Sequence, residues 1–145
     1  MGLIKRILFV CTGNACRSPA AEALLKQAAL DLFVESAGTH PHYEITAITR
    51  AYLRQQHADH YLKAYPESVD SKDLEAFDII VAMESHHREY LLHRCPQCEP
   101  KTEVWNISDP YFLDPARANH VYDSIKQKVI CLVQTIRAGA FEVKG

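Results

Sequence analysis

Residues 10–25 read VCTGNACRSPAAEALL and join an apolar run to an amphipathic helical pattern. The apolar run at 3–10 predicts a short strand, and the pattern at 18–30 predicts a helix. Ser18 is a suitable N-cap residue and Pro19 suits the first helical position, so the helix is expected to begin there. The segment between strand and helix is therefore a tight loop that carries two cysteines and an arginine.

The alternation of strand and helix continues along the chain. Further strands are predicted at 32–36, 78–83 and 102–105, and further helices at 45–56, 84–94 and 119–138. Gly139 ends the last helix, since glycine readily adopts the left-handed backbone that follows many helices. This order predicts an α/β fold, a small doubly wound parallel sheet of about four strands with helices on both faces. We expect residues 1–145 to form one such domain, with the loop after the first strand at the sheet edge where ligands bind.

The composition is that of an ordinary globular protein, with 145 residues, 48% hydrophobic residues and a formal net charge of −2. This balance predicts no broad affinity for nucleic acid or anionic membranes. The apolar stretch in residues 1–10 is too short for a secretory signal, and no run is long enough to span a membrane. Five dispersed cysteines indicate a reduced cytoplasmic protein whose cysteines are free or catalytic. We expect a monomer.

The loop after the first strand has the composition of an anion site. A loop that leads into a helix presents unpaired N–H groups and the positive end of the helix dipole. Gly13 and Asn14 tolerate positive φ, which turns N–H groups inward, and the planar guanidinium of Arg17 fits two phosphate oxygens. The same dipoles favour the thiolate of Cys11, so one loop can supply both a nucleophile and a phosphate site. They give the positive field that a metal would otherwise provide, so neither cofactor nor metal is expected.

The loop sequence VCTGNACRSP is similar to V-C-x-G-N-x-C-R-S-P, the signature of the low-molecular-weight protein tyrosine phosphatases. Further similarity lies in SAGT at 36–39, FDIIVAM at 77–83 and DPYF at 109–112, so the resemblance covers most of the chain. It implies a small doubly wound fold and the hydrolysis of phosphomonoesters through a phosphocysteine intermediate. The partners would be phosphotyrosine-containing protein substrates.

The resemblance also implies roles for individual residues. Cys11 would be the nucleophile, and Arg17 would bind the phosphate and the transition state. Asn14 and Ser36 would brace the strained turn of the loop, and Ser18 would hydrogen-bond the Cys11 sulfur. The phosphate-binding loop would comprise Thr12, Gly13, Asn14, Ala15, Cys16 and Ser18. The substrate wall would comprise His42, Tyr43, Tyr111 and Phe112.

A general acid must protonate the leaving oxygen, and two Asp-Pro pairs offer a candidate. Asp109 and Asp114 both precede a proline, which biases each of them to an extended backbone in a loop. The residues alone leave the two aspartates equally suited. The resemblance implies Asp109, because Tyr111 and Phe112 then match the family's aromatic wall, and Asp114 would only shape a turn.

Three segments depart from the family pattern. HPHYEITAITRAYL at 40–53 lacks the usual Gly and Asp, AYPESV at 64–69 replaces an arginine-containing segment, and Glu84 stands where Asp is commoner. These changes leave the catalytic residues whole but alter the walls around them. We therefore expect the departures to affect substrate preference rather than catalysis.

The remaining cysteines and histidines carry weaker signals. Cys16 either forms a protective disulfide with Cys11 or fills a small pocket under the loop. Cys95 and Cys98 suggest zinc, but no second ligand pair follows them, so they are expected to be loop cysteines. Cys131 is expected in or near the core. The histidines expected at solvated helix positions are His57, His60, His86 and His87.

Two other functions are compatible with the same loop. A thiol-dependent arsenate reductase would resolve its intermediate with two further cysteines, for which Cys95 and Cys98 are candidates. The first of these would lie at the end of the third strand, however, where this chain has Met83. A non-catalytic phosphotyrosine-binding module is disfavoured because Cys11 and Arg17 are intact and an Asp-Pro pair is present.

Overall fold

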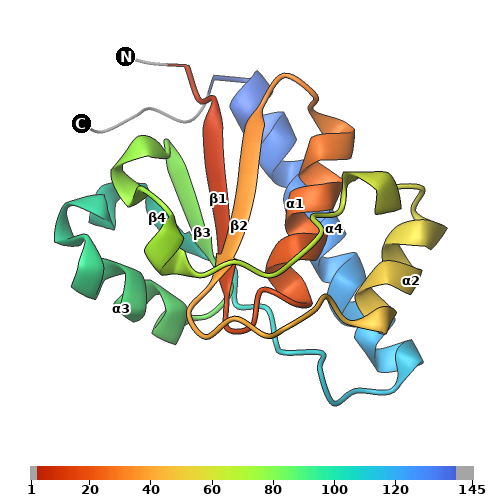
Figure 1. Cartoon of the computed structure of the whole chain (residues 1–145). Coiled ribbons are helices and arrows are strands. Elements are labelled where there is room, and N and C mark those ends of the chain that lie inside the picture. The colour runs from red at the N-terminus through yellow and green to blue at the C-terminus, as the bar shows by residue number, and fades with distance from the viewer. Residues whose placement is uncertain (1–2, 140–145) are drawn as a thin grey trace.

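Four parallel strands form one sheet in the computed structural model, which describes residues 3–139 (Figure 1). The strands are β1 (Arg6–Cys11), β2 (Phe33–Gly38), β3 (Ile79–Ala82) and β4 (Thr102–Val104). Their order is β2-β1-β3-β4, and each neighbouring pair is parallel. The predicted parallel α/β sheet is confirmed, although the first strand begins at Arg6 rather than at residue 3.

Helices cover both faces of this sheet (Figure 1). They are α1 (Arg17–Ala28), α2 (Ala47–Gln55), α3 (Ser85–Arg94) and α4 (Pro115–Arg137). Successive strand residues alternate between two buried clusters. Phe9 and Val81 belong to the cluster with α1, α2 and α4, whereas Val10 and Ile80 belong to the cluster with Leu91 of α3. Because both faces are covered, the central strands are apolar from Ile7 to Cys11 and from Ile79 to Ala82, as parallel strands commonly are.

The expected N-cap at Ser18 is wrong. α1 begins at Arg17, and Ser18 and Pro19 lie within its first turn. The Ser18 hydroxyl is turned toward the Cys11 sulfur, 2.9 Å away, and so does not cap the helix. Its side chain serves the loop instead of the helix end.

α4 begins earlier than the residue 119 predicted from its apolar pattern. Asp114 is the N-cap residue, its Oδ1 accepts from the N–H of Arg117 at 3.0 Å, and Pro115 occupies the start of the helix. An Asp-Pro pair at these two positions is a recognised helix start. The predicted end is confirmed, since Gly139 follows the helix with φ of +69°.

Two expectations about the cysteines are also wrong. Cys95 ends α3, Cys98 lies in the 3₁₀ helix Pro96–Lys101, and the two form a disulfide with their Cα atoms 5.4 Å apart. The expectation that every cysteine is free or catalytic therefore fails at this pair. Cys131 is exposed rather than buried, because it lies off the face of α4 that carries Val129 and Leu132 into the core.

β1 is the point at which the chain changes direction across the sheet. β2 pairs with one of its edges and β3 with the other. Loops at the carboxyl ends of strands on either side of such a switch point diverge and leave a crevice. The loop of residues 12–16 follows β1 directly and therefore lies at this crevice, as predicted.

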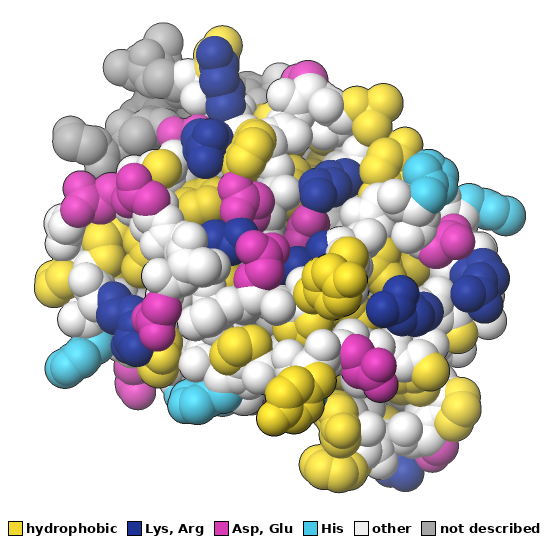
Figure 2. All heavy atoms as spheres, in the orientation of Figure 1, with side chains coloured by type: hydrophobic (Ala, Val, Ile, Leu, Met, Phe, Trp, Pro, Cys, Tyr) yellow, Lys and Arg dark blue, Asp and Glu magenta, His cyan; other side chains and the backbone are white. Residues whose placement is uncertain are grey.

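Charged side chains of both signs are interspersed over the face of the molecule shown in Figure 2. Neither sign dominates that face, which agrees with the formal net charge of −2. Over residues 3–139, none of the helices combines the length and the apolar character needed to cross a membrane.

Candidate active site

Asn14 holds the turn of the loop in a left-handed conformation, with φ of +51°, and its side chain is fully buried. Its Nδ2 donates to the hydroxyls of Ser18 at 2.8 Å and Ser36 at 2.9 Å. Its Oδ1 accepts from Lys63 Nζ at 2.7 Å and from the backbone N–H of Glu67 at 2.8 Å. All the hydrogen-bonding positions of the amide are used, so these bonds offset the cost of a left-handed non-glycine residue.

Cys11 ends β1 at the base of this loop and is 2% exposed. Its Sγ lies 2.9 Å from Ser18 Oγ. Ser18 Oγ accepts a hydrogen bond from Asn14 Nδ2, and its own hydroxyl proton has two acceptors in reach, the sulfur at 2.9 Å and the carbonyl oxygen of Ala37 at 3.4 Å, of which the sulfur is the nearer. A hydrogen bond in that direction stabilises a thiolate over a thiol.

Two glycines allow close contacts around the loop. Gly13 does not adopt the positive φ expected of it; a Cβ there would instead lie 2.7 Å from Cδ2 of His42. At Gly38, which ends β2, a Cβ would lie 2.5 Å from the carbonyl oxygen of Thr12 and 2.9 Å from the N–H nitrogen of Asn14. Gly38 thus lets the loop lie against the end of β2. This role was not predicted from the sequence, although Gly38 belongs to the family segment SAGT.

Arg17 is buried, with 2% exposure, although it is a charged residue beside a pocket. Its Nη1 donates to Glu84 Oε2 at 2.5 Å and to the carbonyl oxygen of Ile107 at 2.7 Å. Its Nη2 lies 3.9 Å from Asp109 Oδ2. These contacts fix the plane of the guanidinium group. Glu84 is therefore a partner of Arg17, whereas in the sequence Glu84 stands out only as a departure from the family pattern.

His87 is completely buried, which contradicts its predicted solvated position. Its Nδ1 accepts from the N–H of Glu84 at 3.0 Å, so its Nε2 carries the proton that bonds Thr12 Oγ1 at 2.8 Å. Burial, and to a smaller extent the charges of His86 and Arg17, lowers the pKa of His87 to about 3. The ring therefore remains neutral and ties α3 to the loop.

The other histidines were predicted to be exposed to solvent, and one of them lies near two possible metal ligands. His57, His60 and His86 are exposed, as predicted. Glu84, His86 and His87 place possible ligand atoms within 4.8 Å of one another. Glu84 is engaged with Arg17, however, and both ring nitrogens of His87 are hydrogen-bonded, so this group does not offer a ready set of metal ligands.

The two candidate aspartates lie in different environments. Asp109 lines the same pocket as Cys11 and Arg17, and its Oδ1 accepts from the N–H of Tyr111 at 3.0 Å. Asp114 caps α4 instead, and the N–H of Arg117 is the main reason that its pKa is lowered. Of the two aspartates, only Asp109 therefore lines the pocket of Cys11 and Arg17.

The model of the low molecular weight phosphotyrosine protein phosphatase family matches residues 6–140. The chain belongs to this family. The phosphatase Etp of Escherichia coli K12, named a low molecular weight protein-tyrosine-phosphatase, is 31% identical over 129 residues, which cover 83% of this chain and 87% of Etp.

Two further phosphatases are also similar to this chain. A protein tyrosine phosphatase from Entamoeba histolytica, solved with Hepes in its active site, has a TM-score of 0.84 and 27% identity, covering 94% of this chain and 99% of its own. A protein-arginine-phosphatase from Geobacillus stearothermophilus is 33% identical over 98 residues, which cover 67% of this chain and 66% of that protein.

In this phosphatase the predicted substrate wall is only partly at the pocket. His42 and Tyr111 line it and pack edge to face, with ring centroids 5.4 Å apart. Tyr43 is fully exposed and lines an adjoining hollow with Pro41. Phe112 packs against Tyr111, but this residue is 93% exposed and lies outside the residues that line the pocket.

Cys16 of the phosphatase loop is free, as is Cys11. Its Sγ lies 3.3 Å from Thr46 Oγ1, and burial raises the pKa of its thiol. In this structure Cys16 fills the space beneath the loop, which is one of the two alternatives that the sequence left open.

Proposed function

We propose that this phosphatase hydrolyses phosphotyrosine in proteins through a phosphocysteine intermediate. The observation that carries the proposal is that Cys11, Arg17 and Asp109 line one pocket at the carboxyl end of β1. Each has the chemistry that one part of the reaction needs: a nucleophile, a planar cation and an acid. Family membership supports the same activity.

The proposed reaction has two steps. In the first, the Cys11 thiolate attacks phosphorus, the bond from phosphorus to the phenolic oxygen breaks, and protonated Asp109 gives its proton to that oxygen. In the second, the Asp109 carboxylate takes a proton from water, the water oxygen attacks phosphorus, and the P–S bond breaks. Inorganic phosphate leaves and the thiolate is restored. Throughout, Arg17 and the loop N–H groups would hold the phosphoryl oxygens.

Arg17→Lys is expected to lower kcat by about 10²–10³, because an ammonium cannot replace the bidentate fork of a guanidinium. The lysine would also lose geometry that Glu84 and Ile107 impose on the native side chain. Steady-state kinetics on a phosphotyrosine peptide measure the effect. Arg50→Lys, at an exposed position of α2, is the matched control. A change confined to KM would show that Arg17 only docks the substrate.

The activity itself is tested with purified protein on a phosphotyrosine peptide, without metal or thioredoxin. We expect turnover there, and a phosphoarginine peptide serves as the second substrate because one relative is named a protein-arginine-phosphatase. A preference for phosphoarginine would reassign the substrate while keeping the nucleophile. Turnover of neither peptide would contradict the proposal.

The arsenate reductase alternative has less support. Cys95 and Cys98 are bonded to each other and belong to the second buried cluster, whereas Cys11 belongs to the first. Met83 is completely buried immediately after β3, where the first resolving cysteine would be required. Arsenate reduction with thioredoxin is nevertheless a direct test of this alternative. We also propose a cytoplasmic location for the phosphatase, since a reducing compartment keeps Cys11 free. The disulfide between Cys95 and Cys98 is compatible with this location because both residues are buried away from reductants in solution.

A further inference from the structure

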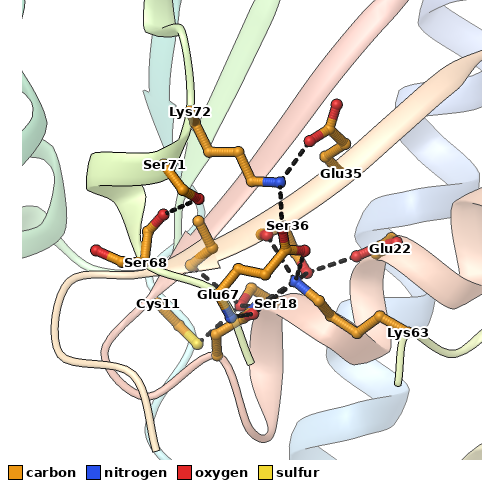
Figure 3. A network of polar contacts seen from close by, with 12 residues as sticks. Cys11, Ser18, Glu22, Glu35, Ser36, Lys63, Glu67, Ser68, Ser71 and Lys72 are labelled. Carbon is orange, nitrogen blue, oxygen red and sulfur yellow. Dashed lines mark hydrogen bonds and ion pairs between the residues drawn. The ribbon is translucent and has the colours of Figure 1, made fainter. Parts of the chain in front are cut away.

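Lys63 is a buried lysine whose ammonium group reaches the loop from outside it. Its side chain is 7% exposed. Nζ donates to Asn14 Oδ1 at 2.7 Å and to the carbonyl oxygen of Ser36 at 2.8 Å, and it pairs with Glu67 Oε1 at 2.7 Å. Figure 3 shows Lys63 pointing into the same network as Ser18, Ser36 and Cys11. A lysine is seldom buried to this degree without a specific role for its charge.

The directions of the hydrogen bonds connect Lys63 to the nucleophile. Lys63 has only donors, so Asn14 Oδ1 must accept from it. Asn14 Nδ2 donates to Ser18 Oγ at 2.8 Å, and the nearer acceptor for the Ser18 hydroxyl proton is then Cys11 Sγ at 2.9 Å, with the carbonyl oxygen of Ala37 farther away at 3.4 Å. Every donor along this path points toward the sulfur. Hydrogen bonds in such a chain polarise one another, and an ammonium at the far end strengthens the last of them.

We propose that Lys63 is a positioning residue that acts through Asn14 and Ser18 to hold Cys11 as a thiolate aimed at the substrate. This inference rests on the proposed function and adds to it a residue from outside the loop signature. Lys63 lies immediately before the segment AYPESV, where the sequence departs from the family pattern. The positive charge near the loop therefore comes from a residue that adjoins this altered segment.

The charges around Lys63 form a compact cluster. Glu67 and Glu22 oppose the effect of burial, which on balance lowers the pKa of Lys63. Ser36 Oγ donates to Glu22 Oε1 at 2.5 Å, so Glu22 also orients the second hydroxyl that Asn14 binds. The carboxylates of Glu67 and Glu22 therefore keep the ammonium group of Lys63 in place, where it donates a hydrogen bond to Asn14 of the loop.

Lys72 provides a matched control within the same cluster. Its side chain is 8% exposed, and its Nζ pairs with Glu35 Oε1 at 2.5 Å and Glu67 Oε2 at 2.9 Å. Its ammonium is directed to the carboxylates of Glu35 and Glu67 (Figure 3). Lys63 and Lys72 thus share burial, charge and a partner in Glu67, and they differ in contact with the loop.

The test compares Lys63→Met with Lys72→Met by following alkylation of Cys11 with iodoacetamide at pH 6, resolved by peptide mass spectrometry. Because the ammonium acts on the sulfur only through the intervening side chains of Asn14 and Ser18, we expect its loss to shift the balance between thiol and thiolate about three- to tenfold. We expect Lys63→Met to slow alkylation by that factor and Lys72→Met to leave it within about twofold. The other ionisable groups near Cys11 are unchanged in both variants: Cys16, Arg17, His42 and Asp109.

Kinetics and a second variant separate positioning from folding. We expect Lys63→Met to lower kcat on a phosphotyrosine peptide about tenfold with a smaller change in KM, because thiolate supply limits chemistry rather than docking. Lys63→Gln keeps a donor without a charge, and its alkylation rate should lie between those of wild type and Lys63→Met. It also replaces the methionine variant if that one fails to fold.

Two results would overturn the proposal. One is alkylation of Cys11 at the wild-type rate in folded Lys63→Met or Lys63→Gln. The other is equal slowing in Lys72→Met, which would mean that the net charge of the cluster matters rather than the bond to Asn14. Alkylation needs no substrate, so this readout stands even if the phosphotyrosine activity fails.

Discussion

Cys11→Ser is expected to abolish phosphotyrosine hydrolysis, with a loss of more than about 10⁴ in kcat, while the protein stays folded. A serine hydroxyl remains protonated in the same loop, so no phosphoenzyme forms. The substitution removes little volume, and the bonds of Asn14 that shape the loop do not involve the sulfur. Turnover of a phosphotyrosine peptide and the melting temperature measure the two parts of this expectation.

Cys131→Ser is the matched control for this prediction, because Cys131 is a free cysteine exposed on α4. It should keep full activity. Binding of inorganic phosphate to Cys11→Ser should also persist, since Arg17 and the loop N–H groups remain. Activity of Cys11→Ser within tenfold of wild type would exclude a phosphocysteine intermediate.

Asp109→Asn is expected to lower the rate on phosphotyrosine by roughly 10²–10⁴, because the phenolic leaving group needs a proton. The loss should shrink on an aryl phosphate whose phenol is strongly acidic, since that group departs readily as the anion. Comparing kcat on the two substrates measures the effect. Asp109 lines the pocket and lies 3.9 Å from Arg17, so it can reach a bound ester.

Asp114→Asn is the natural comparison for the acid. Asn is as good an N-cap residue as Asp, so α4 should form and both substrates should be hydrolysed at nearly the wild-type rate. If Asp114→Asn instead showed the substrate-dependent loss, the assignment of the acid to Asp109 would be wrong.

The parts of the fold that the sequence predicted are those encoded by local patterns. The apolar run before Cys11 and the apolar run at 79–82, which is mostly β-branched, are typical of buried strands, and the loop between strand and α1 has a short, specific sequence. The start of α4 was encoded locally too, in the pair Asp114-Pro115, but both Asp-Pro pairs were interpreted as loops. A capping rule applied to each pair would have separated them.

The residues that sequence reasoning missed depend on contacts between distant segments. His87 looks solvated in its own helix, and only its bond to Thr12, 75 residues earlier, explains its burial. Lys63 is an unremarkable lysine until the fold places it 2.7 Å from Asn14. The disulfide between Cys95 and Cys98 depends on the 3₁₀ turn after α3, which has no strong periodic signal.

The long sequence separation of the Arg17 contacts has a consequence for how the enzyme gains activity. Arg17 sits in the first helix, but its carbonyl partner Ile107 is 90 residues away. Such contacts form late, since the entropy of closing long loops must be overcome before they contribute stability. A chain still emerging from the ribosome holds Cys11 and its loop sequence long before it holds the partner that orients Arg17. Regain of turnover should therefore trail the return of helical signal during refolding, and activity reports completion of the whole topology.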